Sequence, residues 1–205
     1  MSEKIKVVLF DIGGVLVELS GVSTMLEWMG GRVSRPEMWK MWLSSPAVRA
    51  FETGQIQPNP FASQLIEEMS LPVSGGELLK QFATWNLRLF PGALDLVASI
   101  PQRYTRATLC NSNAVHWPQL MSHKGLVEAF DPHFVSHLTG KIKPASDAFY
   151  QVIDSLNCHP AEILFLDDNT LNTNAASRIG ITAFQVRGVT EAQEVLTRTG
   201  ILGVP

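Results

Sequence analysis

The 205-residue chain has only two cysteines, Cys110 and Cys158, which lie far apart and form no CxxC motif. This pattern indicates neither a zinc site nor a disulfide framework. An excess of positive charge is also missing, because 16 Lys and Arg residues stand against 19 Asp and Glu residues and the net charge is −3. We therefore expect no nucleic-acid partner and no polybasic membrane anchor.

Long hydrophobic runs are absent as well. Residues 1–6 are polar and charged, and the apolar stretch at 7–10 is too short for the hydrophobic region of a signal peptide or for a membrane span. We therefore expect a cytoplasmic protein. Hydrophobic residues make up 45% of the chain, which is enough to bury a substantial core. The sequence leaves the oligomeric state open.

Short apolar runs followed by turn residues recur along the chain and are typical of strands buried on both faces of a sheet. Helix-like segments lie between them. Residues 146–156 follow Pro144 with helical apolar spacing, and residues 169–179 begin with a capping Asn and stop at Gly180. This alternation predicts an α/β fold with a Rossmann-like parallel sheet. The expected strands are 4–10, 106–110, 162–166 and 181–186.

The stretch from 17 to 90 interrupts this alternation. Its apolar residues fall at helical intervals, and prolines at positions 36, 46, 58 and 60 mark helix starts. We predict an inserted α-helical domain at 17–90 and a core domain formed by 1–16 and 91–205. Four of the five tryptophans lie in this insert, and we expect them to pack between its helices, with one or two lining a substrate pocket. They are Trp28, Trp39, Trp42 and Trp85.

Polar residues follow the predicted strands. Ligands of open parallel sheets bind at the carboxyl ends of the strands, so these side chains should meet at one edge. Clustered carboxylates repel one another unless a cation lies among them, and Mg²⁺ is the usual cation for carboxylates, water and a substrate phosphate. The residues are Asp11 after the first strand, Cys110 and Asn111 after the second, Lys143 in the loop GKIKP, and Asp167 and Asp168 after the third.

This set of residues suits phosphoryl transfer. A carboxylate can accept a phosphoryl group as an acyl phosphate that water later cleaves, and a lysine can neutralise the charge on the phosphate. Taken singly, Asp11 could cap a turn, Asp167 and Asp168 could cap the next helix, and Lys143 could be a surface lysine. Their order along the chain and their shared position favour the functional interpretation.

Four motifs resemble, in order and spacing, those of the haloacid-dehalogenase superfamily: FDIGGVL, LCNSN, KIKP and LFLDDN. The insert resembles the small helical cap of that family. A glycine two residues after Asp11 is similar to the sugar-phosphatase branch that includes alpha-D-glucose-1-phosphate phosphatase. The resemblance implies a magnesium-dependent phosphatase that hydrolyses a small phosphorylated metabolite, such as a sugar phosphate, through an aspartyl-phosphate intermediate.

The resemblance also implies a role for each polar residue at the predicted edge. Asp11 is the nucleophile and a metal ligand, and the carbonyl of Gly13 is a second ligand. Asp168 binds the metal directly and Asp167 binds it through water, Lys143 holds the phosphate, and the Cys110–Asn111 peptide donates a hydrogen bond to a phosphate oxygen.

Two positions depart from the family pattern. Most family phosphatases have an aspartate at the position of Gly13, where it acts as general acid and base. Losing such a group costs roughly 10²–10⁴ in rate, so an anomeric sugar phosphate or an acyl phosphate, whose leaving group departs readily, suits this site better than an alkyl phosphate. Cys110 replaces the usual Ser or Thr, and a thiol is a weak donor. We expect Cys110→Ser to keep or raise phosphatase activity.

Other functions remain open at this point. A metal-free haloacid dehalogenase that uses Asp11 on carbon fits the missing second aspartate, but it gains nothing from paired Asp167 and Asp168. A phospho-ligand-binding protein without turnover is the other alternative. A phospho-accepting receiver module is excluded because its acidic pair precedes the acceptor.

The sequence leaves the role of a few other polar residues undecided and predicts a structural role for the rest. Arg49 and Glu52, near FETG, face either the site or solvent. Asn113 and His116 are expected to begin a helix. The remaining histidines, His123, His133, His137 and His159, have no metal-ligand spacing and are expected to be structural.

Overall fold

The computed structural model describes residues 5–85, 88–122 and 125–203. Its centre is a five-stranded sheet in the order β3-β2-β1-β4-β5, and every pairing is parallel. The predicted α/β class with a parallel sheet is therefore confirmed. The strands are β1 (Val7–Phe10), β2 (Thr105–Cys110), β3 (His133–Val135), β4 (Ile163–Asp167) and β5 (Thr182–Gln185).

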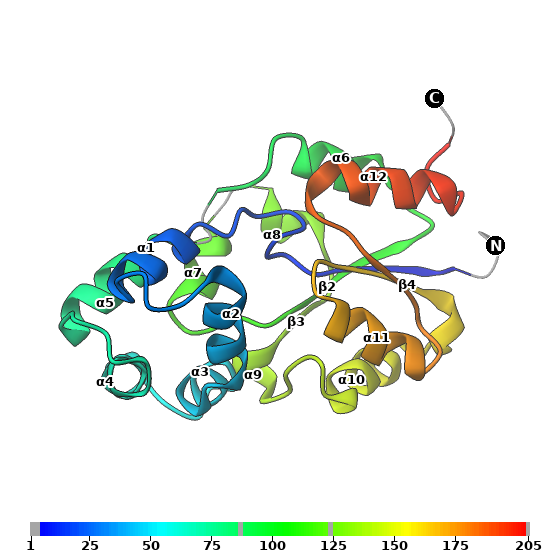
Figure 1. Cartoon of the computed structure of the whole chain (residues 1–205). Coiled ribbons are helices and arrows are strands. Elements are labelled where there is room, and N and C mark those ends of the chain that lie inside the picture. Colours follow the sequence, from blue (N-terminus) through cyan, green and yellow to red (C-terminus); the bar gives the residue numbers. More distant parts are fainter. Residues whose placement is uncertain (1–4, 86–87, 123–124, 204–205) are drawn as a thin grey trace.

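The sheet is covered on both faces, with α6 and α12 on one side and α10 and α11 on the other (Figure 1). Successive side chains of a strand point to opposite faces. In β1, Val8 and Phe10 therefore pack in the cluster under α6 and α12, while Val7 and Leu9 pack in the cluster under α10 and α11. The covering helices are α6 (Ala93–Ser99), α10 (Ser146–Leu156), α11 (Thr170–Arg178) and α12 (Gly188–Arg198).

Most of the predicted elements of the core are present. Helix α10 has the expected bounds, and the side chain of Asn169 caps α11 by accepting a hydrogen bond from the Leu171 N–H (3.0 Å). Four predicted strands are found with slightly different ends. Strand β3 was not predicted, because three residues give no readable apolar pattern. Short elements complete the core: α7 (His116–Leu120), α8 (Leu126–Ala129), α9 (Ser136–Thr139) and the 3₁₀ helix η1 (Pro160–Glu162).

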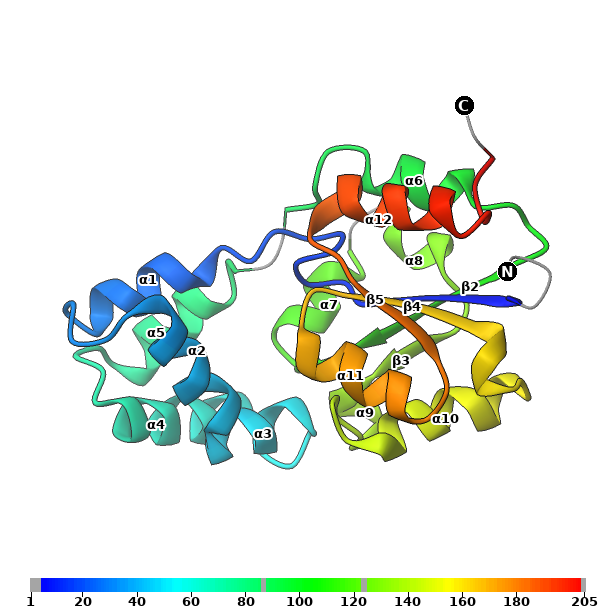
Figure 2. The same cartoon turned by 45° about the vertical axis from the view of Figure 1, so that its right-hand side comes forward.

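In its described residues, the stretch inserted after β1 forms five helices that lie beside the sheet (Figure 2). We call them the helical unit. They surround an apolar cluster of their own, in which the Phe51 and Phe61 rings stack 4.2 Å apart. The predicted prolines stand in the first turns of three of these helices. The unit consists of α1 (Gly21–Trp28), α2 (Arg35–Ser44), α3 (Pro46–Glu52), α4 (Pro58–Met69) and α5 (Gly75–Phe82).

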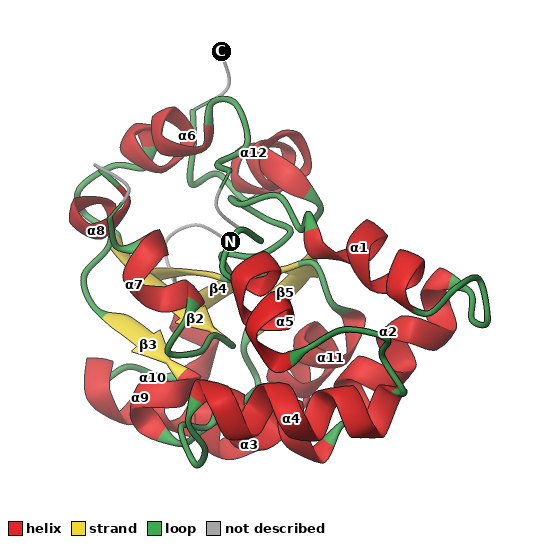
Figure 3. Cartoon of the chain, turned by 90° about the vertical axis from the view of Figure 1, so that its left-hand side faces the viewer, coloured by secondary structure: helices red, strands yellow, loops and turns green. Residues whose placement is uncertain are grey.

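Two of the contacts between the helical unit and the core lie at its connections and at α3. Its incoming and outgoing connections run antiparallel, with Glu18 N–H donating to the Arg88 carbonyl and Phe90 N–H to the Leu16 carbonyl, each at 2.8 Å. Helix α3 contacts α9 of the core (Figure 3). The helices thus face the carboxyl edge of the sheet. Within the described ranges, no helix combines the length and apolarity needed to cross a membrane.

Candidate active site

Three carboxylates and a lysine meet where β1 and β4 end. Asp11 follows β1, Asp167 ends β4 and Asp168 comes next, and one oxygen from each lies within 4.8 Å of the others. Lys143 reaches them from the loop between α9 and α10, with its Nζ 2.9 Å from Asp11 Oδ1 and 2.7 Å from Asp167 Oδ2. Parallel strands explain this meeting, because their carboxyl ends share one edge.

The loop that carries Lys143 is held by the side chain of Asn111. Asn111 Nδ2 donates to the Lys143 carbonyl, and the Lys143 N–H donates to Asn111 Oδ1, both at 3.0 Å. This pair of bonds fixes the lysine backbone to the end of β2. The sequence drew attention to the peptide of Asn111, and the anchoring by its side chain was missed, because nothing in the chain order pairs it with the Lys143 loop.

Asp167 is fully buried and its oxygens already accept several hydrogen bonds. Lys143 and Asn172 donate to Oδ2, at 2.7 and 3.0 Å, and the Asn169 N–H and Asn172 donate to Oδ1, at 2.8 and 3.0 Å. Asp167 does not line the cavity that Asp11 and Asp168 line. Its position suits a group that orients Lys143 and acts on a ligand indirectly.

The cluster carries more negative than positive charge. Burial raises the pKa of Asp11 to about 7; Lys143 opposes this shift, and Asp167 and Asp168 add to it. Burial likewise raises the pKa of Asp168 to about 6, with Asp167 reinforcing the shift. Burial works against the charge on Lys143, but Asp11 and Asp167 hold its pKa above the usual range. A divalent cation among these oxygens would relieve the repulsion.

The donor set fits a hard divalent cation. Carboxylate and carbonyl oxygens are the ligands that Mg²⁺ and Ca²⁺ take, and no sulfur or imidazole belongs to the described three-carboxylate group. The loop after Asp11 comes very close to it. A Cβ added to Gly14, whose φ is +72°, would lie 2.3 Å from Asp168 Oδ2, so this position requires glycine. The close approach keeps the FDIGG backbone beside the acidic cluster.

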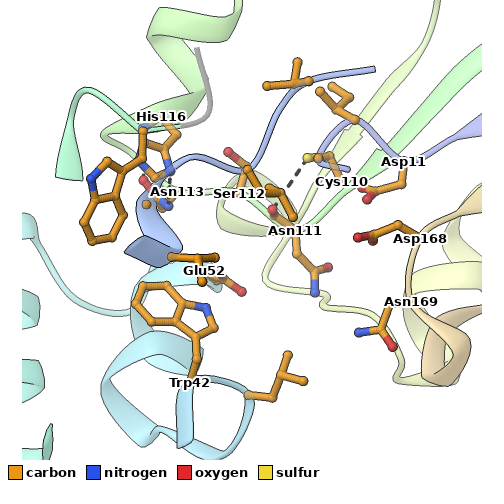
Figure 4. A pocket seen from close by; sticks show the side chains of 18 of the residues that line it. Asp11, Trp42, Glu52, Cys110, Asn111, Ser112, Asn113, His116, Asp168 and Asn169 are labelled. Atoms are coloured by element: carbon orange, nitrogen blue, oxygen red, sulfur yellow. Dashed lines mark hydrogen bonds between the residues drawn. The ribbon is translucent and has the colours of Figure 1, made fainter. Parts of the chain in front are cut away.

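A cavity of about 190 Å³ separates this cluster from the helical unit. Its floor is polar and includes Asp11, Gly13, Asn111, Lys143 and Asp168. Other lining residues come from the helical unit and are mostly apolar. They include Met25, Met38, Trp39, Trp42, Phe82 and Trp85, and Figure 4 shows Trp42 across the cavity from Asp11 and Asp168. Three of the four tryptophans of the insert thus line the cavity.

Glu52 and Arg49, which the sequence left open, differ in position. Glu52 lines the cavity and lies on the side of the helical unit (Figure 4), whereas Arg49 is exposed and is not part of the lining. Burial raises the pKa of Glu52 to about 8; Lys143 opposes the shift and Asp11 adds to it. Its carboxyl group is therefore mostly protonated at neutral pH.

His116 and Cys110 also line the cavity, but their side chains contact other groups of the protein. His116 Nε2 lies 2.6 Å from the Phe82 carbonyl and Nδ1 lies 3.2 Å from Asn113 Nδ2, and burial lowers the pKa of this histidine to about 4. Helix α7 begins at His116, and just before it Asn113 Oδ1 accepts from the Val115 N–H (3.1 Å) and the His116 N–H (3.0 Å). Cys110 is buried, with Sγ 3.5 Å from the Asn111 carbonyl, and burial raises the pKa of its thiol.

The other described histidines lie outside the cavity lining. His133 Nδ1 is 3.0 Å from Thr108 Oγ1, and His159 Nδ1 accepts from the Ala161 N–H (3.2 Å). His137 lies in α9. His133 and His159 thus contact other groups of the protein, the structural role of these histidines stays a prediction, and His123 lies outside the described residues.

The chain is similar to several known proteins. The chain is 24% identical to D-ribitol-5-phosphate phosphatase of Bacteroides thetaiotaomicron, over 94% of this chain and 97% of that protein. It is 28% identical to sesquiterpene phosphatase astK of Aspergillus oryzae, over 88% and 89%. A solved HAD family enzyme of B. thetaiotaomicron, in complex with magnesium and inorganic phosphate, matches with a TM-score of 0.72 and 24% identity, over 89% of this chain and 94% of that one.

A comparison with models of protein families identifies the family of this chain. The model for haloacid dehalogenase-like hydrolases matches residues 5–180, which include all four motifs and the helical unit. The chain belongs to the haloacid dehalogenase-like hydrolase family.

Proposed function

We propose that this hydrolase is a magnesium-dependent phosphatase in which Asp11 attacks a phosphate monoester and is transiently phosphorylated. The observation that carries the proposal is the position of Asp11 on the floor of the cavity, within a three-carboxylate group and 2.9 Å from Lys143 Nζ. Both curated relatives named above are phosphatases, which supports the same reaction.

Each residue of the floor has a separate task in this proposal. Asp11, Asp168 and the Gly13 carbonyl would hold Mg²⁺, with Asp167 acting through water, and the ion would supply charge neutralisation for the phosphate. Lys143 neutralises phosphate oxygens that would otherwise be repelled by Asp11. The Cys110–Asn111 peptide donates to a phosphate oxygen. A carboxylate oxygen of Asp11 bonds to phosphorus as the bond to the alcohol oxygen breaks, and water then cleaves the acyl phosphate.

We further propose that the alcohol part of the substrate is largely apolar. Among the described lining residues that come from α1, α2, α3 and α5, Glu52 is the ionisable one, and the rest are glycine, aliphatic, methionine and aromatic. Apolar surface buried against such walls contributes about 25 cal/mol per Å², whereas sugar hydroxyls buried there without partners are costly. The names of the two phosphatase relatives indicate a sugar-alcohol phosphate for one and a terpenoid for the other. Apolar cavity walls favour a substrate of the second class.

The test is a phosphate-release assay with n-hexyl phosphate, glucose 6-phosphate and glucose 1-phosphate. We expect Mg²⁺-dependent turnover that a chelator and Asp11→Asn both abolish, with kcat/KM for hexyl phosphate about tenfold or more above that for glucose 6-phosphate. The two glucose esters test the expected preference for an anomeric leaving group. Phosphate release unaffected by chelation, or halide release from 2-chloropropionate in its place, would contradict the proposal and favour a metal-free dehalogenase.

A further inference from the structure

The site lacks a proton donor at the position where the family pattern places one. Residue 13 is glycine, and although its backbone lines the cavity it has no side chain to offer a proton. An alkoxide is a poor leaving group, so an alkyl phosphate needs an acid beside the departing oxygen. A chain without Asp at position 13 must either use activated substrates or obtain this acid from elsewhere in the cavity.

Most ionisable side chains that line the cavity are committed to other tasks. Asp11 is the proposed nucleophile, Lys143 binds the phosphate, and Asp168 binds the metal. Both ring nitrogens of His116 already face protein partners, the Phe82 carbonyl and the Asn113 side chain. Cys110 is buried at the end of β2 and its thiol lies next to the Asn111 carbonyl. Among the described lining residues, Glu52 alone remains as an uncommitted acid.

The Glu52 carboxyl group is available to a ligand. Figure 4 shows its head group directed into the cavity, across from the floor that holds Asp11 and Asp168. No hydrogen bond or ion pair within the described part of the chain engages this carboxyl. Burial has the largest effect on the pKa of this group, and Lys143 and Asp11 are the charged residues that act on it.

The backbone around Glu52 is held firmly against the core. Glu52 ends α3, and Gly54 follows with φ +73°. A Cβ at Gly54 would lie 2.3 Å from the His137 carbonyl oxygen, so the end of α3 touches the backbone of α9 directly. This contact fixes the distance between the helical unit and the sheet edge at the position where the Glu52 side chain enters the cavity.

We propose that Glu52 is the general acid and base of the reaction, a role that rests on the proposed phosphatase function. As Asp11 bonds to phosphorus, the electron pair of the breaking P–O bond goes to the alcohol oxygen, which takes the Glu52 proton. The Glu52 carboxylate then takes a proton from water as that water attacks phosphorus. The bond to Asp11 breaks, its electron pair returns to Asp11, and Glu52 is protonated again.

The protonation state of Glu52 agrees with this role. Burial is the main cause that raises its pKa to about 8, with Asp11 adding to the shift and Lys143 opposing it. Asp168, Cys110 and His116 are the other titratable groups that line the cavity. An acid with a pKa near the working pH is well suited to give and recover a proton.

The first test compares two leaving groups in the wild type and in Glu52→Gln. For n-hexyl phosphate, whose alkoxide must be protonated, we expect kcat/KM to fall roughly 10²–10⁴-fold. For p-nitrophenyl phosphate, whose phenolate departs without help, we expect a fall of less than about tenfold. Glu67→Gln makes the same chemical change on the exposed surface of α4 and should leave both substrates unaffected. An equal fall for both substrates, or no fall for hexyl phosphate, would overturn the assignment.

Two further readouts separate proton transfer from a structural role. Wild-type kcat/KM for hexyl phosphate should fall as the pH rises through about 8, and Glu52→Gln should lack this limb. Gly13→Asp in the Glu52→Gln background should restore hexyl phosphate turnover at least tenfold. The fit is feasible, because a Cβ at residue 13 meets only the flexible Leu19 Cδ2, at 3.2 Å. A limb that persists in Glu52→Gln would exclude Glu52 as the acid.

The failure of this inference is distinguishable from failure of the proposed function. If p-nitrophenyl phosphate is not hydrolysed with Mg²⁺, or if Asp11→Asn leaves its hydrolysis intact, the phosphatase proposal itself is wrong and Glu52 has no such reaction to serve. If that hydrolysis holds and hexyl phosphate turnover is indifferent to Glu52→Gln, only the Glu52 assignment is wrong.

Discussion

At the scale of single residues, Cys110 shows how the local environment limits what a thiol can do. It is 5% exposed, and burial raises its pKa, so the thiol stays neutral and donates weakly next to the phosphate site. We expect Cys110→Ser to leave kcat/KM unchanged or raise it up to about tenfold, because a hydroxyl is a stronger donor. Phosphate-release kinetics check this, with the melting temperature as a folding control. Loss of activity in a folded Cys110→Ser protein would give the thiol a role of its own.

Glu52 should also leave a signature in the pH dependence of stability. Its pKa is about 8 in the folded protein and ordinarily 4.5. The unfolded chain therefore loses this proton first, so the stability that the group contributes is complete below about pH 4.5 and is lost as the pH rises through about 8. We expect the free energy of unfolding to fall less between about pH 5 and pH 9 in Glu52→Gln than in the wild type.

Urea unfolding of both proteins at the two pH values measures this difference. The exposed Glu67→Gln variant should follow the wild-type pH dependence. Parallel curves for the wild type and Glu52→Gln would show that Glu52 ionises normally in the folded protein.

Residues of the site differ in how far the sequence could identify them. Asp11 and Asp168 follow strands, so parallel-sheet topology alone predicts that they meet, whereas Lys143 could be identified only from its motif loop. Glu52 could not be assigned, because its place on α3 does not reveal which face of the helix turns toward the core. The useful signal was indirect: Gly13 shows that a proton donor is missing, and FETG combines an acid with a glycine suited to close backbone contact.

At the scale of elements, burial decided which segments were predictable. Strands β1 and β4 are buried throughout and read as continuous apolar runs, and α10 has a clear helical period. Strand β3 has only three residues and begins with His133, so the sequence has no apolar pattern there that predicts a strand. The separate helices of the insert could be anticipated from prolines at their first turns, but their packing on α9 depends on tertiary contacts that the sequence does not encode locally.

The contact between α3 and α9 can be tested with a pair of glycine variants. Gly54 and Gly30 both have positive φ, +73° and +61°, but a Cβ at Gly54 would meet the His137 carbonyl oxygen whereas a Cβ at Gly30 would have no heavy atom within 4 Å. Backbone strain should cost each alanine variant about 1 kcal/mol of stability, and the clash with the His137 carbonyl oxygen should add a further loss in Gly54→Ala. We expect Gly54→Ala alone to lower kcat/KM for hexyl phosphate about tenfold or more, because it moves the end of α3 away from the sheet edge.

Steady-state kinetics and urea unfolding of the two variants provide the comparison. Equal activity in Gly54→Ala and Gly30→Ala would show that the contact with α9 does not position the catalytic groups.

At the scale of the whole molecule, the site exists only where two parts of the fold meet. The sheet edge supplies the charged floor, and the helical unit supplies the apolar walls and Glu52. The sequence predicted the floor in some detail because motif order encodes it. The division into domains at 1–16, 17–90 and 91–205, the cytoplasmic location and the lack of a nucleic-acid partner stay predictions.

The acidic floor also links magnesium to the stability of the whole protein. Three carboxylates within 4.8 Å repel one another in the folded state, and this repulsion is relieved when a cation binds. A ligand that binds only the folded state at 100 times its Kd adds about 2.7 kcal/mol to the free energy of unfolding. We therefore expect Mg²⁺ to raise the melting temperature of the wild type, as measured by differential scanning calorimetry with and without a chelator.

Asp168→Asn is the control for this experiment, because it should change stability in chelator and the response to Mg²⁺ in opposite directions. Removing one carboxylate relieves the repulsion without a metal, so the variant in chelator should be at least as stable as the wild type in chelator. The same change removes a metal ligand, so Mg²⁺ should no longer stabilise the protein. A metal-free dehalogenase would show no Mg²⁺ effect in either protein, and that outcome would contradict the magnesium site without any appeal to enzyme activity.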